Sequence, residues 1–283
     1  YLKQNDITLN NLIFRDTIDL NLLKTLSFEI TLVDHHVLAD LWKPFSSKIT
    51  EILDHRPKDP SWKWDDKVQD KMQMVGSCAT LVANEILQNQ NIQNNDLQIL
   101  AKLLHGTILL DTVNFSKSAD RTRELDIKVV EQLENILKIP KTGLLEYRSK
   151  IFNDLSAART DITSLTPIQI LFKDMKKLGH IPISGMPILI EKYIDIPGSK
   201  EAIFEMCNLH STDILILMGM QIEGINVTRD LGIYNKNSFT KINEIVSFLK
   251  NNKQPDLFLQ DKQSNMKGLM LFSQGNIKAT RKH

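Results

Sequence analysis

The sequence predicts an α/β protein of two domains, and three observations lead to this prediction. The chain has 283 residues, which is about twice the usual size of one domain. In its first half, short β-branched runs alternate with longer helical patterns, which is typical of a parallel sheet with crossover helices. A Pro- and Gly-containing break at 139–143 then interrupts the pattern. We therefore expect a parallel-sheet domain over residues 1–138 and a smaller α/β domain over residues 144–283.

The composition is that of an ordinary globular protein and excludes several classes. Hydrophobic residues make up 42% and charged residues 24%, which is enough apolar material for two cores. The net charge is only +1, without the basic excess of proteins that coat nucleic acid or membranes, and no apolar run reaches about 18 residues. The two cysteines, Cys78 and Cys207, cannot form a disulfide framework. We expect a reduced, cytoplasmic setting with neither membrane nor nucleic acid as a partner.

The beginning of the chain predicts two strands, at 11–14 and 29–33, with a helix at 19–24 between them. Each strand leads directly into polar residues, Asp16 after the first and Asp34-His35-His36 after the second. In open parallel sheets, ligands bind beyond the carboxyl ends of the strands. These polar side chains are therefore candidates for a functional site.

The remainder of the first half predicts a helical layer. The segment Gly76-Ser77-Cys78-Ala79-Thr80 opens a helix, and Ser77 is placed to be its N-cap. A mostly buried helix is expected at 95–110 and a charged helix at 120–137.

The second half predicts alternating helices and strands with adjacent, antiparallel strands. The expected helices are 144–161, 167–178, 200–209 and 241–251, and the expected strands are 181–190, 214–222, 224–234 and 266–273.

Two His-containing segments follow apolar runs, and each has a functional and a structural interpretation. Asp34-His35-His36 is either a polar loop or a metal site, in which His beside carboxylates suits Mn, Zn or Co better than Mg. Asp54-His55-Arg56 is either a capped turn before proline or a phosphate clamp, because a planar guanidinium binds phosphate with two hydrogen bonds. Asp111, at the end of an apolar run, must be capping, paired or metal-bound, because a carboxylate there is otherwise costly.

Other residues have weaker functional interpretations. His105 is expected to be a partly buried structural histidine, and Lys176 to lie on a solvated charged face. The basic end of the chain, 274–283, is either disordered or a strand end that grips phosphate. Trp62 and Trp64 are expected to pack a loop, with a lid or a partner surface as the alternative.

Taken together, these segments resemble the DHH phosphoesterase superfamily, and within it the prune and exopolyphosphatase group. Their order and spacing agree with the group over at least residues 12–126, and the second half agrees more loosely. The resemblance rests on Leu12–Asp16, Leu32–His36, Leu53–Pro57, Val75–Val82 and His105–Asp111. Relatives of the group include the manganese-dependent inorganic pyrophosphatases, which have the same two-domain plan.

The resemblance implies a two-metal phosphohydrolase with its active site between the domains, acting on short-chain inorganic polyphosphate or pyrophosphate. The implied cofactors are two divalent ions, Mn with Mg or Co as alternatives. Asp16, Asp34, His35 and Asp111 match the metal ligands of the group, and His36 resembles its general acid toward the leaving group.

Cationic side chains would complete the implied site on the substrate side. Arg56 and His55 would line the phosphate path. From the second domain, Lys176 resembles the substrate lysine of the family, and Arg281 and Lys282 resemble its terminal Arg-Lys pair.

One departure from the family pattern affects the expected activity. An Asp-x-Asp on the first strand normally supplies metal ligands, and it has no counterpart in this sequence. By this resemblance we expect the sequence to be a fragment rather than a truncated product, and to bind metals poorly and be inactive alone.

Two alternatives to the polyphosphate hydrolase remain open. One is a cyclic-nucleotide phosphodiesterase, because a phosphodiester makes similar demands on two metals. The other is an intracellular scaffold with a vestigial site, which would use the helix at 120–137 and the tryptophan loop to bind protein partners. The branch that cleaves oligonucleotides is disfavoured, because no two of the 11 Gly are adjacent.

Overall fold

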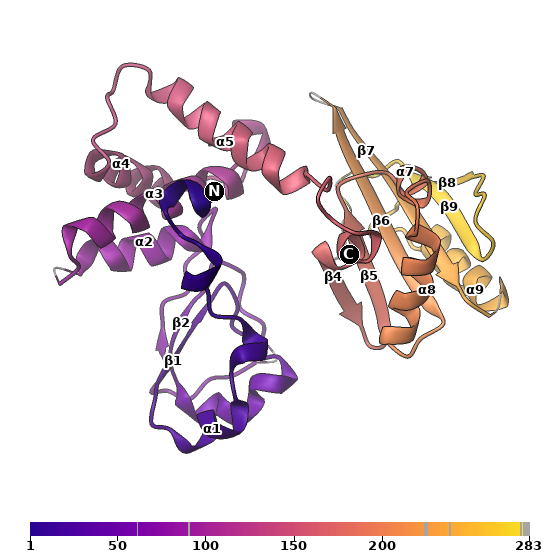
Figure 1. Ribbon diagram of the computed structural model, residues 1–283, viewed down its shortest axis with the longest axis horizontal. Helices are drawn as coiled ribbons and strands as arrows, with labels where there is room; N and C mark the ends of the chain where they lie inside the picture. The colour runs from indigo at the N-terminus through magenta and orange to yellow at the C-terminus, as the bar shows by residue number, and fades with distance from the viewer. Residues whose placement is uncertain (61, 90, 224–225, 238, 278, 280–283) are drawn as a thin grey trace. The chain divides into compact units, whose positions relative to one another are not determined.

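The computed structural model describes residues 1–60, 62–89, 91–223, 226–237, 239–277 and 279. The chain folds as two compact units, residues 1–159 and 160–283 (Figure 1). Within the part of the chain that is described, no helix combines the length and hydrophobicity needed to cross a bilayer.

The first unit contains a three-stranded parallel sheet in the order β1-β2-β3. Its strands are β1 (Ile30–Val33), β2 (Ile49–Leu53) and β3 (Gln69–Asp70). The predicted strand at 29–33 is therefore confirmed. Leu32 and Ile52 are buried on this sheet and pack with Leu38 and Ile49.

The predicted strand at 11–14 is wrong. Leu9–Asn11 forms a 3₁₀ turn instead, and the Asn11 side chain accepts a hydrogen bond from the Thr8 amide at 2.9 Å. Such local side-chain to backbone bonds compete with strand pairing. Ile13 is 84% exposed, so this apolar run has no sheet to pack on among the described residues.

Helices pack beside the sheet to form the rest of the first unit. They are α1 (Leu20–Thr25), α2 (Cys78–Gln88), α3 (Asn94–Asp111), α4 (Glu124–Ile136) and α5 (Leu144–Thr160). The helices predicted for these stretches are confirmed, except that α4 begins four residues later than expected. Asp120 adopts a left-handed conformation (φ 47°) that a helix cannot include, which explains the later start.

The first unit ends later than the break at 139–143 that the sequence predicts. The reason is that α5 packs back onto the helices before it: Arg148 makes two hydrogen bonds to Glu134 of α4, and Ile151 joins the cluster of buried side chains on α2, α3 and α4. Gly143, which lies between α4 and α5, is a left-handed turn residue (φ 81°).

The second unit is built on a six-stranded mixed sheet in the order β4-β5-β6-β7-β9-β8. Among the described strands of this sheet, β5 and β6 pair in parallel and all other neighbours are antiparallel. The strands are β4 (Asp174–Leu178), β5 (Ile181–Met186), β6 (Ile214–Glu223), β7 (Asn226–Asn235), β8 (Leu259–Lys262) and β9 (Leu269–Gln274), and the helices are α6 (Pro167–Lys173), α7 (Ile190–Ile194), α8 (Ser199–Leu209) and α9 (Phe239–Asn251).

Several second-half predictions need correction. The helix expected at 167–178 ends at Lys173, because the following residues form edge strand β4, which pairs with β5 across a tight turn containing Gly179 (φ 58°). The strand expected at 181–190 ends at Met186, before helix α7. The predicted antiparallel pairing holds for β6 and β7, whereas β5 and β6 are parallel because α7 and α8 form a crossover between them.

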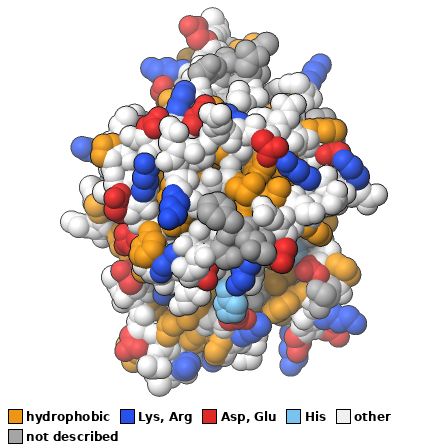
Figure 2. Space-filling model, turned by 90° about the vertical axis from the view of Figure 1, so that its right-hand side faces the viewer, with side chains coloured by type: hydrophobic (Ala, Val, Ile, Leu, Met, Phe, Trp, Pro, Cys, Tyr) orange, Lys and Arg blue, Asp and Glu red, His pale blue; other side chains and the backbone are white. Residues whose placement is uncertain are grey.

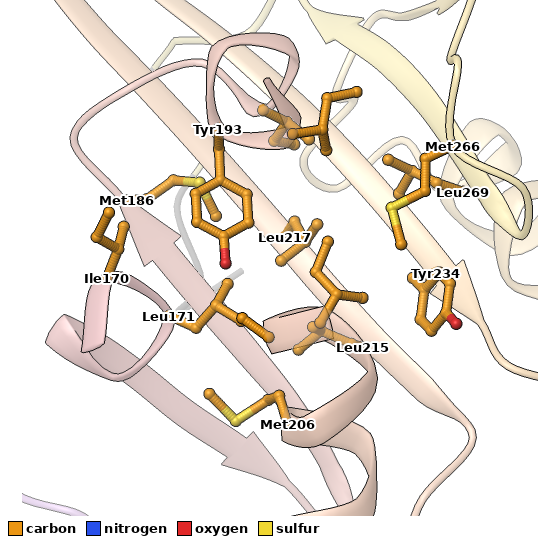
Figure 3. Close-up of a cluster of buried hydrophobic side chains, with 14 of the residues drawn as sticks. Ile170, Leu171, Met186, Tyr193, Met206, Leu215, Leu217, Tyr234, Met266 and Leu269 are labelled. Carbon is orange, nitrogen blue, oxygen red and sulfur yellow. The ribbon is translucent and has the colours of Figure 1, made fainter. Parts of the chain in front are cut away.

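The core of the second unit lies between its sheet and helices α6, α7 and α8. Leu215 and Leu217 of β6 point toward Tyr193 of α7, Leu171 of α6 and Met206 of α8, as Figure 3 shows. Helix α9 covers the opposite face, where Ile242 and Val246 pack on Ile233 and Phe272. The face shown in Figure 2 carries Lys and Arg interspersed with Asp and Glu, in agreement with the balanced charge.

We predict that Asp230, a buried carboxyl in β7, makes the second unit less stable as the pH rises. Its Oδ2 accepts a hydrogen bond from the Ile190 amide at 2.8 Å, yet burial raises its pKa from 3.8 to about 6. Between these values the folded state holds a proton that the unfolded chain has lost, so stability falls as the pH rises through this window, by about 3 kcal/mol in all.

Asp230→Asn should flatten this dependence and stabilise the chain at pH 7. Thermal unfolding of both proteins from pH 4 to pH 7 measures the difference. Equal slopes in parent and variant would contradict the prediction.

Candidate metal centre

Three side chains form a cluster at the carboxyl end of the parallel sheet. One ligand atom from each of Asp34, Asp54 and His55 lies within 4.8 Å of the other two. Asp34 follows β1, and Asp54-His55 follows β2. Val33 and Leu53 are register partners, and the Asp34 amide extends the pairing by donating to the Leu53 carbonyl at 3.0 Å. The end of the ladder therefore brings the two segments together, as expected for a ligand site in an open parallel sheet.

The hydrogen bonds of His55 leave one ring nitrogen available for a cation. Its Nδ1 lies 2.9 Å from the Val75 carbonyl, which can only accept, so Nδ1 carries the hydrogen. In the neutral ring, Nε2 then presents a lone pair toward Oδ1 of Asp34, 3.3 Å away. Two acceptors that face each other need a proton or a metal ion between them, and a backbone carbonyl that orients a ligating imidazole is common in metal sites. These residues therefore fit a divalent cation.

Asp54 is fully buried and stays ionised. Its Oδ2 is 2.6 Å from Nδ1 of His36, and its Oδ1 accepts from the amides of His55 (2.7 Å) and Arg56 (3.2 Å). Burial alone would raise the pKa of this carboxyl. The hydrogen bonds from His36 and the two amides outweigh burial and hold the pKa below its ordinary value of 3.8.

Arg56 places a positive charge at the edge of the cluster. Its Nη2 lies 3.2 Å from Oδ2 of Asp34, and both side chains are about half exposed. An exposed ion pair of this kind contributes little stability, so the guanidinium is free to exchange the carboxylate for an anionic ligand.

The Gly-Ser-Cys-Ala-Thr segment fixes the start of α2 beside the end of β2. Ser77 caps the helix and donates from its Oγ to Oδ2 of Asp111 at 2.6 Å, and Cys78 Sγ donates to the Leu53 carbonyl at 3.3 Å. The predicted N-cap is confirmed. This hydrogen bond holds Asp111 beside the start of α2, near the carboxyl end of β2, although Asp111 is not one of the three clustered residues.

Gly76 is required here because the chain passes very close to its neighbours. A Cβ at this position would lie 2.7 Å from Cγ2 of Thr112 and 2.8 Å from the Arg121 carbonyl. The Gly76 amide and the Thr80 hydroxyl both donate to the buried carboxylate of Asp126, at 2.8 and 2.5 Å. Sequence reasoning missed Asp126, which carries no motif signal of its own.

The structure does not gather all of the ligands expected from the sequence. Asp16 is exposed in the 3₁₀ turn Arg15–Thr17, and exposed His35 has its Nδ1 3.0 Å from the Val33 carbonyl. Neither belongs to the Asp34–Asp54–His55 cluster. His36 is buried with both ring nitrogens hydrogen-bonded, which does not favour the phosphate contact expected for it.

In the second unit, Lys176 is exposed, as expected for a solvated face, but it lies on edge strand β4 rather than on the helix expected at 167–178. The predicted substrate residues Arg281 and Lys282 lie outside the described residues.

Comparisons with known proteins agree with this architecture. Residues 153–283 match the model of the DHHA2 domain. The chain is 33% identical over 289 residues to the exopolyphosphatase PRUNE1 of Homo sapiens and 32% identical to that of Rattus norvegicus; each alignment covers all of this chain and 61% of the relative. The chain thus spans less than two thirds of the length of these relatives.

The fold is also similar to a crystal structure from Methanococcus jannaschii assigned to the family II inorganic pyrophosphatases. The TM-score is 0.56 and the identity 19%, and the match covers 89% of this chain and 78% of the other. This similarity supports the α/β fold described above. Residues 153–283 thus match the DHHA2 domain family, and the whole chain is similar to the exopolyphosphatases of the prune group. The resemblance seen in the sequence is confirmed.

The geometry predicts which residues bind a metal ion. Asp34→Asn and His55→Ala should weaken Mn²⁺ binding about tenfold or more, because each removes a clustered ligand. Asp16→Asn and His35→Ala should change the affinity much less. Electron paramagnetic resonance of free Mn²⁺ in titrations of the chain measures all four affinities.

The opposite pattern of Mn²⁺ affinities would contradict this prediction and favour the ligand set expected from the sequence. That pattern is loss of Mn²⁺ binding in Asp16→Asn and His35→Ala, with binding retained in His55→Ala.

Proposed function

We propose that the chain is a metal-dependent phosphoanhydride hydrolase that acts on short-chain inorganic polyphosphate or pyrophosphate. The observation that carries this proposal is the approach of Nε2 of His55 to Oδ1 of Asp34, at 3.3 Å, with the guanidinium of Arg56 3.2 Å from the other oxygen of Asp34. This arrangement suits a cation and a phosphate together. The names of the relatives, exopolyphosphatase and inorganic pyrophosphatase, support the same reaction class.

Our proposed metal ligands are Asp34, Asp54 and His55, with Asp111 as a further carboxylate at the same corner of the sheet. Compared with the set implied by the family resemblance, Asp54 and His55 take the places of Asp16 and His35, while Asp34 and Asp111 are kept. We propose two ions, and Mn²⁺ in preference to Mg²⁺, because Mg²⁺ favours oxygen ligands and His55 supplies a nitrogen. Co²⁺ would satisfy the same set.

The roles of the protein groups follow from their contacts. The Val75 carbonyl holds the His55 ring with Nε2 toward the cluster, and three hydrogen bonds keep Asp54 ionised. Arg56 binds phosphate oxygens through its planar fork, which phosphoryl transfer needs because charge neutralisation and positioning dominate the reaction. Bound divalent ions would lower the pKa of an attacking water and neutralise the phosphate charge.

The second domain would add cations to the substrate side. Lys176, Arg281 and Lys282 are the proposed substrate contacts, and exposed Lys176 is accessible to an anion within its own unit. We place the protein in the cytoplasm because neither of its two cysteines, both free and buried, forms a disulfide.

The scaffold alternative receives less support from the structure. The rings of Trp62 and Trp64 pack together, with their centroids 5.7 Å apart. Trp64 Nε1 donates a hydrogen bond to the His36 carbonyl at 2.9 Å. Helix α4 buries Val129, Val130 and Leu133 in the core. Both proposed docking elements therefore serve the internal packing of the first unit.

Phosphate release tests the proposed function. Because the chain is expected to be inactive alone, the test uses a protein that contains this chain together with an Asp-x-Asp strand. With Mn²⁺ or Mg²⁺, this protein should release phosphate from pyrophosphate and tripolyphosphate faster than it opens a cyclic nucleotide. Arg56→Lys should raise the KM about tenfold or more, because lysine lacks the planar fork and charged hydrogen bonds contribute about 1.5–3 kcal/mol.

Arg123→Lys is the matched control. Arg123 is 46% exposed, against 44% for Arg56, and its carboxylate partner is Asp120 rather than a residue of the cluster. If the protein that also contains the Asp-x-Asp strand is folded and binds metal but releases phosphate from none of the three substrates, the proposal is refuted. Faster turnover of the cyclic nucleotide would favour the phosphodiesterase instead.

A further inference from the structure

We propose that Asp126 is a positioning residue: it holds the peptide group before Gly76, whose carbonyl orients the ring of His55. This inference rests on the proposed function, because His55 is one of the proposed metal ligands. Asp126 lies outside the cluster of three ligands and acts on it through the backbone.

The carboxylate of Asp126 is fully buried and accepts hydrogen bonds from two backbone amides and a hydroxyl. Its Oδ2 accepts from the amides of Arg123 at 2.7 Å and Gly76 at 2.8 Å, and its Oδ1 accepts from the hydroxyl of Thr80 at 2.5 Å. The bond from Arg123 is local and caps α4, whereas the other two donors lie 50 and 46 residues away along the chain. A carboxyl group is costly to bury, and a helix cap does not require burial. The two remote bonds therefore indicate a task beyond capping.

The bond to Gly76 reaches the candidate site because a peptide group is planar. The amide of Gly76 and the carbonyl of Val75 belong to one trans peptide group, in which the N–H and the C=O point in opposite directions. Asp126 binds the N–H on one side, and Nδ1 of His55 lies 2.9 Å from the carbonyl oxygen on the other. Rotation of this peptide group would break both bonds together. Asp126 therefore fixes the direction of the carbonyl that accepts from His55.

Close packing around Gly76 leaves little room for this peptide group to turn. A Cβ at Gly76 would lie 2.7 Å from Cγ2 of Thr112 and 2.9 Å from Oδ2 of Asp126. Val75 is 7% exposed and packs with Leu53, the last residue of β2. Close-packed groups transmit a displacement rather than absorb it. A shift of the Asp126 carboxylate would therefore reach the His55 ring.

The Val75 carbonyl determines how His55 presents its second ring nitrogen. With Nδ1 bonded to this carbonyl, Nε2 lies 3.3 Å from Oδ1 of Asp34. Loss of the carbonyl contact would free the ring to rotate away from the cluster. Because an imidazole that is not oriented binds a metal ion less tightly, metal affinity should report on the Asp126 contact.

The Mn²⁺ affinities of matched variants test this role, in a protein that contains this chain together with an Asp-x-Asp strand. Asp126→Ala should raise the Mn²⁺ dissociation constant about tenfold, the lower end of the usual effect of losing a group that orients a ligand. Asp126→Asn should restore most of the affinity, because its carbonyl oxygen can accept from both amides and its NH₂ group can donate to Thr80. Thr80→Val is the matched control: it removes a hydrogen bond from the same carboxylate, leaves the bond from Gly76 intact and should bind Mn²⁺ as the parent does. Circular dichroism checks that the variants are folded.

A double-mutant cycle shows whether Asp126 acts through His55. In a His55→Ala background, Asp126→Ala should change the Mn²⁺ affinity little, because the ring that the carbonyl orients is gone. A general structural role would weaken binding by the same factor in both backgrounds. Equal factors, or an unchanged Mn²⁺ affinity in folded Asp126→Ala, would overturn the proposal.

The contact can also be followed in the metal-free protein by nuclear magnetic resonance. The Nδ1–H of His55 should give a slowly exchanging proton resonance, identified by its absence from His55→Ala. The resonance should persist in Asp126→Asn and Thr80→Val and be lost in Asp126→Ser. Serine keeps a hydroxyl for the local cap of α4, so this variant also serves if Asp126→Ala does not fold, but its shorter side chain does not reach the Gly76 amide. A resonance retained in Asp126→Ser would contradict the proposal.

The two proposals fail in different ways. A protein that binds Mn²⁺ but releases no phosphate refutes the hydrolase, while the Mn²⁺ affinities of the Asp126 variants still decide the positioning role. A parent protein that binds no Mn²⁺ refutes the metal site, and the His55 resonance then decides whether Asp126 orients the ring.

Discussion

The candidate site of the first unit is organised around one buried charge, the carboxylate of Asp54. Taking an ionised carboxylate out of water costs several kcal/mol unless hydrogen bonds replace the lost hydration. The chain supplies three of them, from the His36 ring and from the amides of His55 and Arg56. Each bond fixes a segment that carries a functional candidate. The requirement to satisfy one buried group thereby determines where the neighbouring ligands point.

Three histidine–carboxylate pairs among the described residues show why proximity alone does not make a metal site. His36 has no ring nitrogen available for a metal ion, because Nδ1 is bonded to Asp54 and Nε2 accepts from the Asp59 amide. His105 and Glu134 are also close, at 3.0 Å, but Arg148 binds both oxygens of Glu134 and neutralises it in the core. His55 differs from both, because its Nε2 faces Oδ1 of Asp34 at 3.3 Å while its Nδ1 is bonded to the Val75 carbonyl. Among the three pairs, this is the one in which either a proton or a metal ion can lie between the nitrogen and the carboxylate.

The elements with strong local signals were predictable from the sequence. The β-branched run before Asp34 forms β1, and Ser77 caps α2 as its position predicts. The errors arose where tertiary context overrides local pattern. Residues 174–178 continue a helical pattern but form an edge strand, because β5 offers a pairing partner across the turn at Gly179. The apolar run 11–14 lacks such a partner among the described residues and is not a strand.

The choice between the two Asp-His segments could not be made from the sequence, since each follows a strand and each pairs Asp with His. What separates them is which ring nitrogen is already bonded, and the deciding partners are remote. The Asp59 amide lies 23 residues from His36, and the Val75 carbonyl lies 20 residues from His55. These contacts exist only once the loop and the start of α2 have folded against the sheet. The Asp59 amide therefore occupies Nε2 of His36, whereas Nε2 of His55 faces the Asp34 carboxylate. The short motifs supply the residue types. The contacts made at the carboxyl end of the folded sheet determine which ring nitrogen of each histidine can bind a ligand.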